Sequence, residues 1–366
     1  MSKKKNKLEK ACEGVTALVI QTNERIRELG VHANSINNVL SIIQNQFDKI
    51  RNVPEGKARE YQKIKEARLE WVKQVEYIES EYQTVNKVSV GSGATGIGVG
   101  VSVAALGPTA AMSIATTFGV ASTGTAISTL SGAAATNAAL AWLGGGTLAA
   151  GGSGMAGGSA LLALAGPVGW TIAGVALIGS GLMFWMTHSQ KSRLERIFLD
   201  VSSRDKRSYE LAIVEINERI SRLIDETSKL NRAIVNIGTF GLDYSTMTEE
   251  QQYTLGTYVN LMYSSTQLLV NPIMGLQPKF TEDDCNRIIF SIEGMDKYAG
   301  KRNLFNYLAN LLFGIKTDET DRKLLAKSYS RNKEFCSQMK IDKSVMTVEL
   351  MNAVSGAIEL VSKNNQ

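Results

Sequence analysis

Two glycine-containing motifs in this chain have residue types that can bind nucleotide phosphates when their spacing and surroundings are right. The residues from Gly91 to Gly96 (GSGATG) fit the spacing G-x-G-x-x-G. That turn needs a βαβ unit and an acidic residue about twenty positions further on, whereas the next charged residue here is Lys191. Gly300 and Lys301 match the end of a phosphate-binding loop, but Arg302 replaces the serine or threonine that would reach a magnesium ion. Neither motif predicts a nucleotide site.

Acid–base and metal-binding residues are equally sparse. The two histidines, His32 and His188, lie far apart. His32 neighbours the apolar seam of a predicted helix, which favours a packed or solvated ring, and His188 follows an apolar span, where it can cap a helix or respond to pH. The acidic run from Glu282 to Asp284 has no cluster of histidine or cysteine that would complete a metal site. We therefore predict a protein that is not an enzyme and needs no cofactor or metal.

The chemistry of this chain instead concerns lipid. The 103 residues from Val88 to Gln190 contain no charged side chain, although 20% of the whole chain is charged, and they hold 22 of its 33 glycines. We call these residues the uncharged segment. A bilayer excludes charge, so a run of this length indicates a membrane-inserting segment.

The strongest candidate span within the uncharged segment is 160–186. It is long enough to cross about 30 Å of hydrocarbon as a helix, with Trp170 in its middle and an aromatic anchor, Phe184 and Trp185, at its end. Small residues four apart allow close helix packing in lipid; these are Ala165, Gly169 and Ala173. A buried helix in a soluble core is the alternative interpretation of this span.

Two further candidate spans are weaker. The run 97–121 is interrupted by Pro108, and 125–150 contains Asn137 and several hydroxyl side chains. Each glycine costs about 1 kcal/mol in a helix relative to alanine, and alanine and glycine gain little on leaving water. The composition therefore favours conditional insertion over a permanent anchor.

Charge and cysteine content restrict the partners and the compartment. Basic residues exceed acidic ones by only five, which does not predict a nucleic-acid partner. Three widely spaced cysteines, Cys12, Cys285 and Cys336, indicate a reducing compartment. The apolar run near the start, 17–20, is too short for a secretory signal. We expect a cytoplasmic protein that associates, conditionally or permanently, with the inner (plasma) membrane. The six basic residues within 191–207 favour the cytoplasmic side.

Long helices must position the uncharged segment. Apolar residues alternate at three and four positions over 15–50, 57–85 and 213–237, which is typical of helices packed in a bundle. Arg68 is the one departure in the second helix, and the third is expected to kink or stutter between Ser202 and Tyr209. The coiled-coil seam is predicted to include Ile64, Trp71, Ile78, Ile216, Ile220 and Leu223.

The predicted fold is mainly α: a long antiparallel, coiled-coil-like helical bundle with a central membrane-inserting segment rich in glycine and alanine, and a C-terminal helical domain. Its divisions are helical arms at 1–87, the uncharged segment at 88–190, a return helix at 191–241 and the C-terminal domain at 242–366. In the last division helices are expected at 248–269, 281–298, 302–313, 317–339 and 344–363.

Heptad helices on both sides of an internal apolar segment resemble the α-helical pore-forming toxins of the cytolysin and tripartite haemolysin type. The resemblance covers about 15–237 and is one of architecture. It implies a soluble bundle that shields its apolar segment and then refolds and oligomerises in a membrane. Bacterial abortive-infection effectors, which act on the membrane of their own host, are the version of this architecture that suits a cytosolic chain.

We therefore expect an oligomerising pore or channel former that disrupts a membrane, with lipid, further copies of itself and a regulatory protein as partners. Two alternatives stay open. The chain can be a non-enzymatic helical scaffold whose apolar segment is a buried core or assembly element, or a constitutive anchor that presents the C-terminal region to a partner.

Overall fold

The computed structural model describes residues 7–90, 186–271, 273–276, 279–338 and 341–364, and within these ranges it is mainly α-helical without a β-strand. All seven residues predicted to enter the membrane, from Pro108 to Trp185, lie outside the described residues. The α-helices are α1 (Lys7–Phe47), α2 (Glu55–Val90), α6 (His188–Ile237), α7 (Glu249–Val270), α8 (Glu282–Ser291), α9 (Arg302–Leu312), α10 (Glu319–Arg331), α11 (Lys333–Gln338) and α12 (Val348–Asn364). Four 3₁₀ turns lie between them: η5 (Tyr244–Thr246), η6 (Met274–Leu276), η7 (Asp296–Lys301) and η8 (Lys343–Val345).

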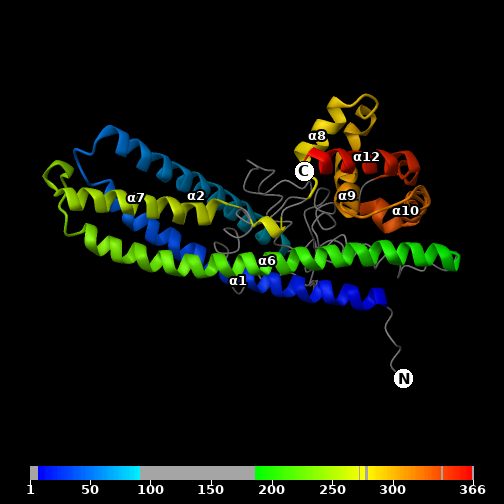
Figure 1. The fold of residues 1–366 in the computed structure, drawn as a ribbon, viewed down its shortest axis with the longest axis horizontal. Helices are drawn as coiled ribbons and strands as arrows, with labels where there is room; N and C mark the ends of the chain where they lie inside the picture. The colour runs from blue at the N-terminus through cyan, green and yellow to red at the C-terminus, as the bar shows by residue number, and fades with distance from the viewer. Residues whose placement is uncertain (1–6, 91–185, 272, 277–278, 339–340, 365–366) are drawn as a thin grey trace, which may run out of the picture.

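Four of these helices, α1, α2, α6 and α7, run lengthwise beside one another (Figure 1). Two tight connections make two antiparallel hairpins, α1–α2 and α6–α7. The first turn contains Pro54, which cannot continue a helix, and Asn52 at φ 57°, a left-handed conformation that asparagine tolerates. In the second turn Gly241 has φ 84°. In both connections, the residues that end the helix come directly after its apolar seam in the sequence.

The central pair, α1 and α6, is parallel. Near their C-terminal ends Gln46 Nε2 donates to the carbonyl of Ile234 at 3.2 Å. Just beyond, Arg51 pairs with Asp243 in a parallel bridge, with the Arg51 amide 2.9 Å from the Leu242 carbonyl. The predicted antiparallel order therefore holds for each hairpin but not between them. Short loops force antiparallel neighbours, whereas the long chain between α2 and α6 lets α6 start again from the same end as α1.

The bundle has one apolar core. Its deepest side chains come from the α1 seam, with Leu29, Ile36, Leu40 and Ile43 fully buried. Five of the six predicted seam residues are buried in this core, and Ile78 lies in α2 where its side chain is not described; the five are Ile64, Trp71, Ile216, Ile220 and Leu223. The helix α7 adds Leu255 and Met262, so it belongs to the bundle.

The helix α6 is continuous over 50 residues, about 75 Å at the usual rise. The expected break between Ser202 and Tyr209 is not there. Asp205, Tyr209 and Ala212 are all buried and carry the inward-facing stripe across this stretch. The apolar pattern missed the continuity because Asp205 is charged, yet it lies on the buried face.

A second core lies over the N-terminal half of α6, where the C-terminal helices gather (Figure 1). Leu194, Ile197, Phe198 and Val201 of α6 pack there with α8 to α12. The two cores thus meet along α6 and divide the described chain differently from a boundary at residue 242, because α7 packs with the bundle. Two predicted helices are shorter than expected. The first ends at Ser291, before Gly294 at φ 78°, and the second is interrupted at Asn332.

Candidate functional site

The site of greatest interest is the start of α6, the first described helix after the central part of the uncharged segment. We call it the α6 junction: residues 187–205 and the side chains that contact them. The helix starts at a capping box, in which Thr187 accepts from the Gln190 amide at 3.3 Å and Gln190 accepts from the Thr187 amide at 3.2 Å. Such a cap contributes about 1 kcal/mol and fixes where the helix begins. His188 is the exposed first residue of α6; Thr187, and not His188, is its cap.

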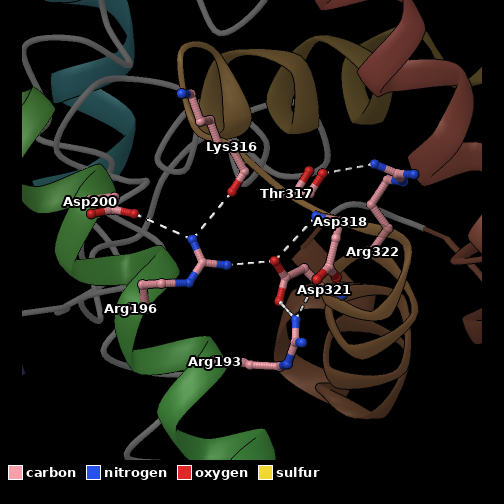
Figure 2. A network of polar contacts seen from close by, with 8 residues as sticks. All are labelled: Arg193, Arg196, Asp200, Lys316, Thr317, Asp318, Asp321 and Arg322. Atoms are coloured by element: carbon pink, nitrogen blue, oxygen red, sulfur yellow. Dashed lines mark hydrogen bonds and ion pairs between the residues drawn. The ribbon is translucent and has the colours of Figure 1, made fainter.

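Two arginines of the α6 junction hold the start of α10 (Figure 2). Arg193 Nη1 lies 2.8 Å from Asp321 Oδ1 and 2.7 Å from Asp318 Oδ2, while Arg196 Nη2 lies 2.5 Å from Asp321 Oδ2. The Asp321 side chain is only 2% exposed, but the arginines are 37% and 44% exposed. One buried carboxylate therefore joins two partly solvated guanidinium groups.

The two aspartates also form the N-terminal cap of α10. Asp318 Oδ1 accepts from the Asp321 amide at 2.7 Å, and Asp321 Oδ2 accepts from the Asp318 amide at 3.2 Å. Hydrogen bonding to Arg193 is the main cause that lowers the pKa of Asp318, and the same bond raises the pKa of Arg193. Both aspartates lie at the N-terminus of α10, the positive end of its dipole, where a carboxylate stabilises a helix.

Three turns further along α6, Arg204 closes the end of α9. Its Nη1 donates to the carbonyls of Asn310, Leu311 and Phe313 at 3.0, 3.0 and 2.7 Å. These carbonyls have no intrahelical donor because they belong to the last turn. Arg204 is itself paired with the buried Asp205 at 2.8 Å. The C-terminal helices thus contact α6 in two ways. They pack on its apolar face, and they bind three of its arginines through ion pairs and hydrogen bonds.

These contacts change the interpretation of the basic cluster at 191–207, which the sequence suggested as a cytoplasmic flank of a membrane span. Arg193, Arg196 and Arg204 bind protein carboxylates and carbonyls in this structure. Asp321 was missed as a site residue. A capping pattern with aspartate at its first and fourth positions, Asp318 and Asp321, was the sequence signal that could have identified the start of α10.

Two further charged side chains are buried at helix contacts in the described part of the bundle. Arg68, the seam departure in α2, is buried and donates from Nε to Gln44 Oε1 at 2.6 Å and from Nη1 to Asn37 Oδ1 at 3.0 Å. Burial lowers the pKa of Arg68. Glu226 of α6 is buried against α7, where the hydroxyl of Ser265 donates to it at 2.6 Å. Such groups specify helix register at a cost in stability.

A cavity of about 490 Å³ lies at the bundle tip between the two hairpin turns. Phe47, Tyr61 and Leu255 give it an apolar wall, and Lys57 Nζ lies 2.6 Å from the Tyr244 hydroxyl oxygen at one side. Burial is the main cause that raises the pKa of Tyr61, aided by its bond to Asp48. The cavity could accept a small amphipathic molecule, but Lys57 and Asp48 are already engaged by Tyr244 and Lys65.

The described residues offer no other chemistry of this kind. Among them, no three histidine, cysteine or acidic side chains gather in a way that could hold a metal ion. No helix in the described ranges is long and apolar enough to cross a membrane. No family model matches this chain, and no curated protein or solved structure matches it.

Proposed function

We propose that this protein is a membrane-inserting, oligomerising effector that forms a pore or channel. The observation that carries the proposal is the uncharged segment, 103 residues that connect two long helices of a bundle. Its first three residues, 88–90, end α2 and its last three, 188–190, begin α6. Any movement of the segment into lipid therefore acts directly on two helices of the bundle.

The contacts at the α6 junction support a regulatory role for the C-terminal helices in this proposal. These helices bind α6 within its first five turns, next to the end of the uncharged segment. A ligand or protein partner that displaces α9 and α10 would release Arg193, Arg196 and Arg204 together. The trigger then acts by separating two packed units, with the inner membrane as the target.

Buried polar groups support a bundle that can rearrange. Arg68 and Glu226 lie in a core where apolar residues would pack with less desolvation cost. The hydrogen-bond partners of Arg68 are neutral amides, and Glu226 accepts from Ser265 and lies 3.8 Å from Arg222 Nη2. A bundle of this kind keeps a definite register and yet is less stable than an all-apolar one. That combination suits a resting state that must later refold.

Dye release from liposomes of anionic bacterial-type lipid, with purified full-length protein, tests the proposal. We expect leakage from wild type, faster once proteolysis has removed the C-terminal helices, and its loss in Gly169→Arg, because an arginine at the centre of a span costs about 2.5–3.5 kcal/mol or more. Gly300→Arg is the matched control, since Gly300 lies in η7 and a Cβ added there would have open space around it, and it should leak like wild type. Equal leakage from both variants, or none from wild type with the C-terminal helices removed by proteolysis, would contradict the proposal.

The second candidate is a helical scaffold. Exposed apolar side chains favour it: Tyr253 and Tyr263 on α7 and Phe290 on α8 are 79%, 55% and 64% exposed. Fractionation separates the two, because a scaffold stays in the supernatant without detergent whether or not lipid vesicles are added.

A further inference from the structure

The outward side of α6 carries a stripe of uncharged residues where a bundle helix normally carries its charges. The residues alternate at three and four positions, all are exposed, and none is charged. Val214, Ile224 and Val235 are 64%, 50% and 73% exposed. We call this set the outer stripe: Val214, Asn217, Ser221, Ile224, Ser228, Asn231 and Val235.

The outer stripe is a palindrome. Its order is Val-Asn-Ser-Ile-Ser-Asn-Val, with Ile224 at the centre. An interface with a two-fold axis has to be self-complementary, because each residue meets its counterpart from the other copy. If two α6 helices lie antiparallel with the axis near Ile224, residues of the same type come together along the stripe: Asn217 comes level with Asn231 of the second copy, and Val214 comes within one residue of Val235.

The charges that border the outer stripe obey the same symmetry. Glu218 and Arg232 are exposed, lie fourteen residues apart on one edge of the stripe, and form no ion pair with another described residue. Antiparallel pairing about Ile224 brings Glu218 within two residues, about 3 Å along the axis, of Arg232 of the second copy, and this happens twice. Parallel pairing about a two-fold axis would instead place this edge of the two copies on opposite sides of the helix pair, so Glu218 and Arg232 of different copies would not meet.

The one charge that meets itself at this axis is balanced within its own chain. Asp225 lies next to Ile224, so antiparallel pairing brings it near Asp225 of the second copy. Lys229 Nζ lies 2.6 Å from Asp225 Oδ2 on the same helix. The local charge at the axis is therefore close to zero.

A single helix face is narrow for a stable dimer, which usually buries about 800 Å² per partner, and α1 widens it. The side of α1 that does not face the core is also uncharged and exposed over Val31, Ser35, Asn38, Ile42 and Asn45. The bond between Gln46 and Ile234 sets an offset of 188 residues between the two parallel helices. With that offset, residues 31–45 lie level with 219–233 of α6, within the outer stripe. The two helices lie side by side (Figure 1).

We propose that the outer stripe is the interface of a two-fold homodimer in which two α6 helices pair antiparallel about Ile224, with salt bridges between Glu218 and Arg232 of opposite copies. The occupant of this face is a second copy of the chain. The dimer deepens the oligomerisation in the proposed function by giving it a surface and a symmetry. Its test uses no membrane, so the dimer and the pore can fail separately.

Charge reversal tests the pairing. In sedimentation-velocity measurements of the full chain over a range of concentrations, Glu218→Arg and Arg232→Glu should each raise the dimer Kd by about tenfold or more. The double variant should restore a Kd close to that of wild type, because both bridges form again with reversed sign. Glu60→Arg, which changes an exposed acid on α2, is the matched control and should not alter the Kd. A monomeric wild type, or a double variant as weak as the singles, would overturn the interface.

Cysteine cross-linking tests the direction. In a background with Cys12 and Cys336 changed to serine, Val214→Cys chains mixed with Val235→Cys chains should be joined by a short bismaleimide, and neither variant should link to itself. Ile224→Cys should link to itself. Self-linking by Val214→Cys or by Val235→Cys would show parallel pairing and refute the two-fold antiparallel dimer.

Discussion

Replacing Arg68 by methionine together with Gln44 by leucine is expected to stabilise the bundle, although Gln44→Leu alone should destabilise it. The Arg68 side chain is 6% exposed and Gln44 1%. Arg68 donates to Gln44 Oε1 at 2.6 Å and to Asn37 Oδ1 at 3.0 Å. Both acceptors are neutral amides, so these bonds satisfy the guanidinium donors without balancing its charge.

The magnitudes follow from what each change leaves behind. Gln44→Leu removes the acceptor from a buried charged donor, which costs about 2–3 kcal/mol. The cost lies at the lower end because Gln44 Nε2 is itself buried without a partner in the described residues, and leucine removes that group too. Replacing both members by apolar residues of similar size is neutral or stabilising by about 1–4 kcal/mol. The two substitutions are therefore strongly non-additive.

Equilibrium unfolding in urea measures the change in the free energy of unfolding of each variant, with the midpoints compared at constant m-value. Arg59→Met is the matched control, because Arg59 lies on the same helix with a 73% exposed side chain and its loss should change the midpoint little. If Gln44→Leu is as stable as wild type, or if the double variant is no more stable than Gln44→Leu, the buried charge is not the source of instability. Under the proposed function, the stabilised double variant should also release liposome dye more slowly than wild type.

Two further predictions concern packing and pH. Gly275→Ala should lower the free energy of unfolding by about 1–3 kcal/mol, because a Cβ there would lie 2.7 Å from the Ala212 amide nitrogen; Gly256→Ala, with open space in the middle of α7, should be neutral or stabilise by about 0.5–1 kcal/mol in the same urea titration. Asp318 has a pKa below its ordinary value of 3.8, so its contribution is complete above that pH and is lost as the pH falls through the folded-state pKa. Asp318→Asn, which keeps a helix cap, should therefore flatten the acid limb of thermal unfolding below about pH 4, and an unchanged acid limb would show that the bond to Arg193 contributes nothing.

The helices themselves could be predicted from the sequence because a packed helix repeats its apolar residues at a spacing set by its own geometry. Most of the seam residues whose side chains are described are buried as their spacing indicates: Val15, Leu29, Ala33, Ile36, Leu40 and Ile43 in α1, and Ile64 and Trp71 in α2. Helix ends could also be predicted wherever a capping residue precedes the apolar seam or a proline or glycine follows it. The uncharged segment is a property of composition alone, and it remains the reason for the proposed function.

Other features depend on residues far apart in the chain. Whether Arg193 faces lipid headgroups or a carboxylate is decided by Asp321, 128 residues later, and the helical repeat contains no information on that meeting. Three other features also depend on distant residues: the parallel order of α1 and α6, the continuity of α6 through Asp205, and the partners of Arg68. Periodicity determines which face of a helix is buried, because that depends on local geometry. Only the tertiary structure decides which helix covers that face, because many pairings bury similar apolar area and a few polar contacts choose among them.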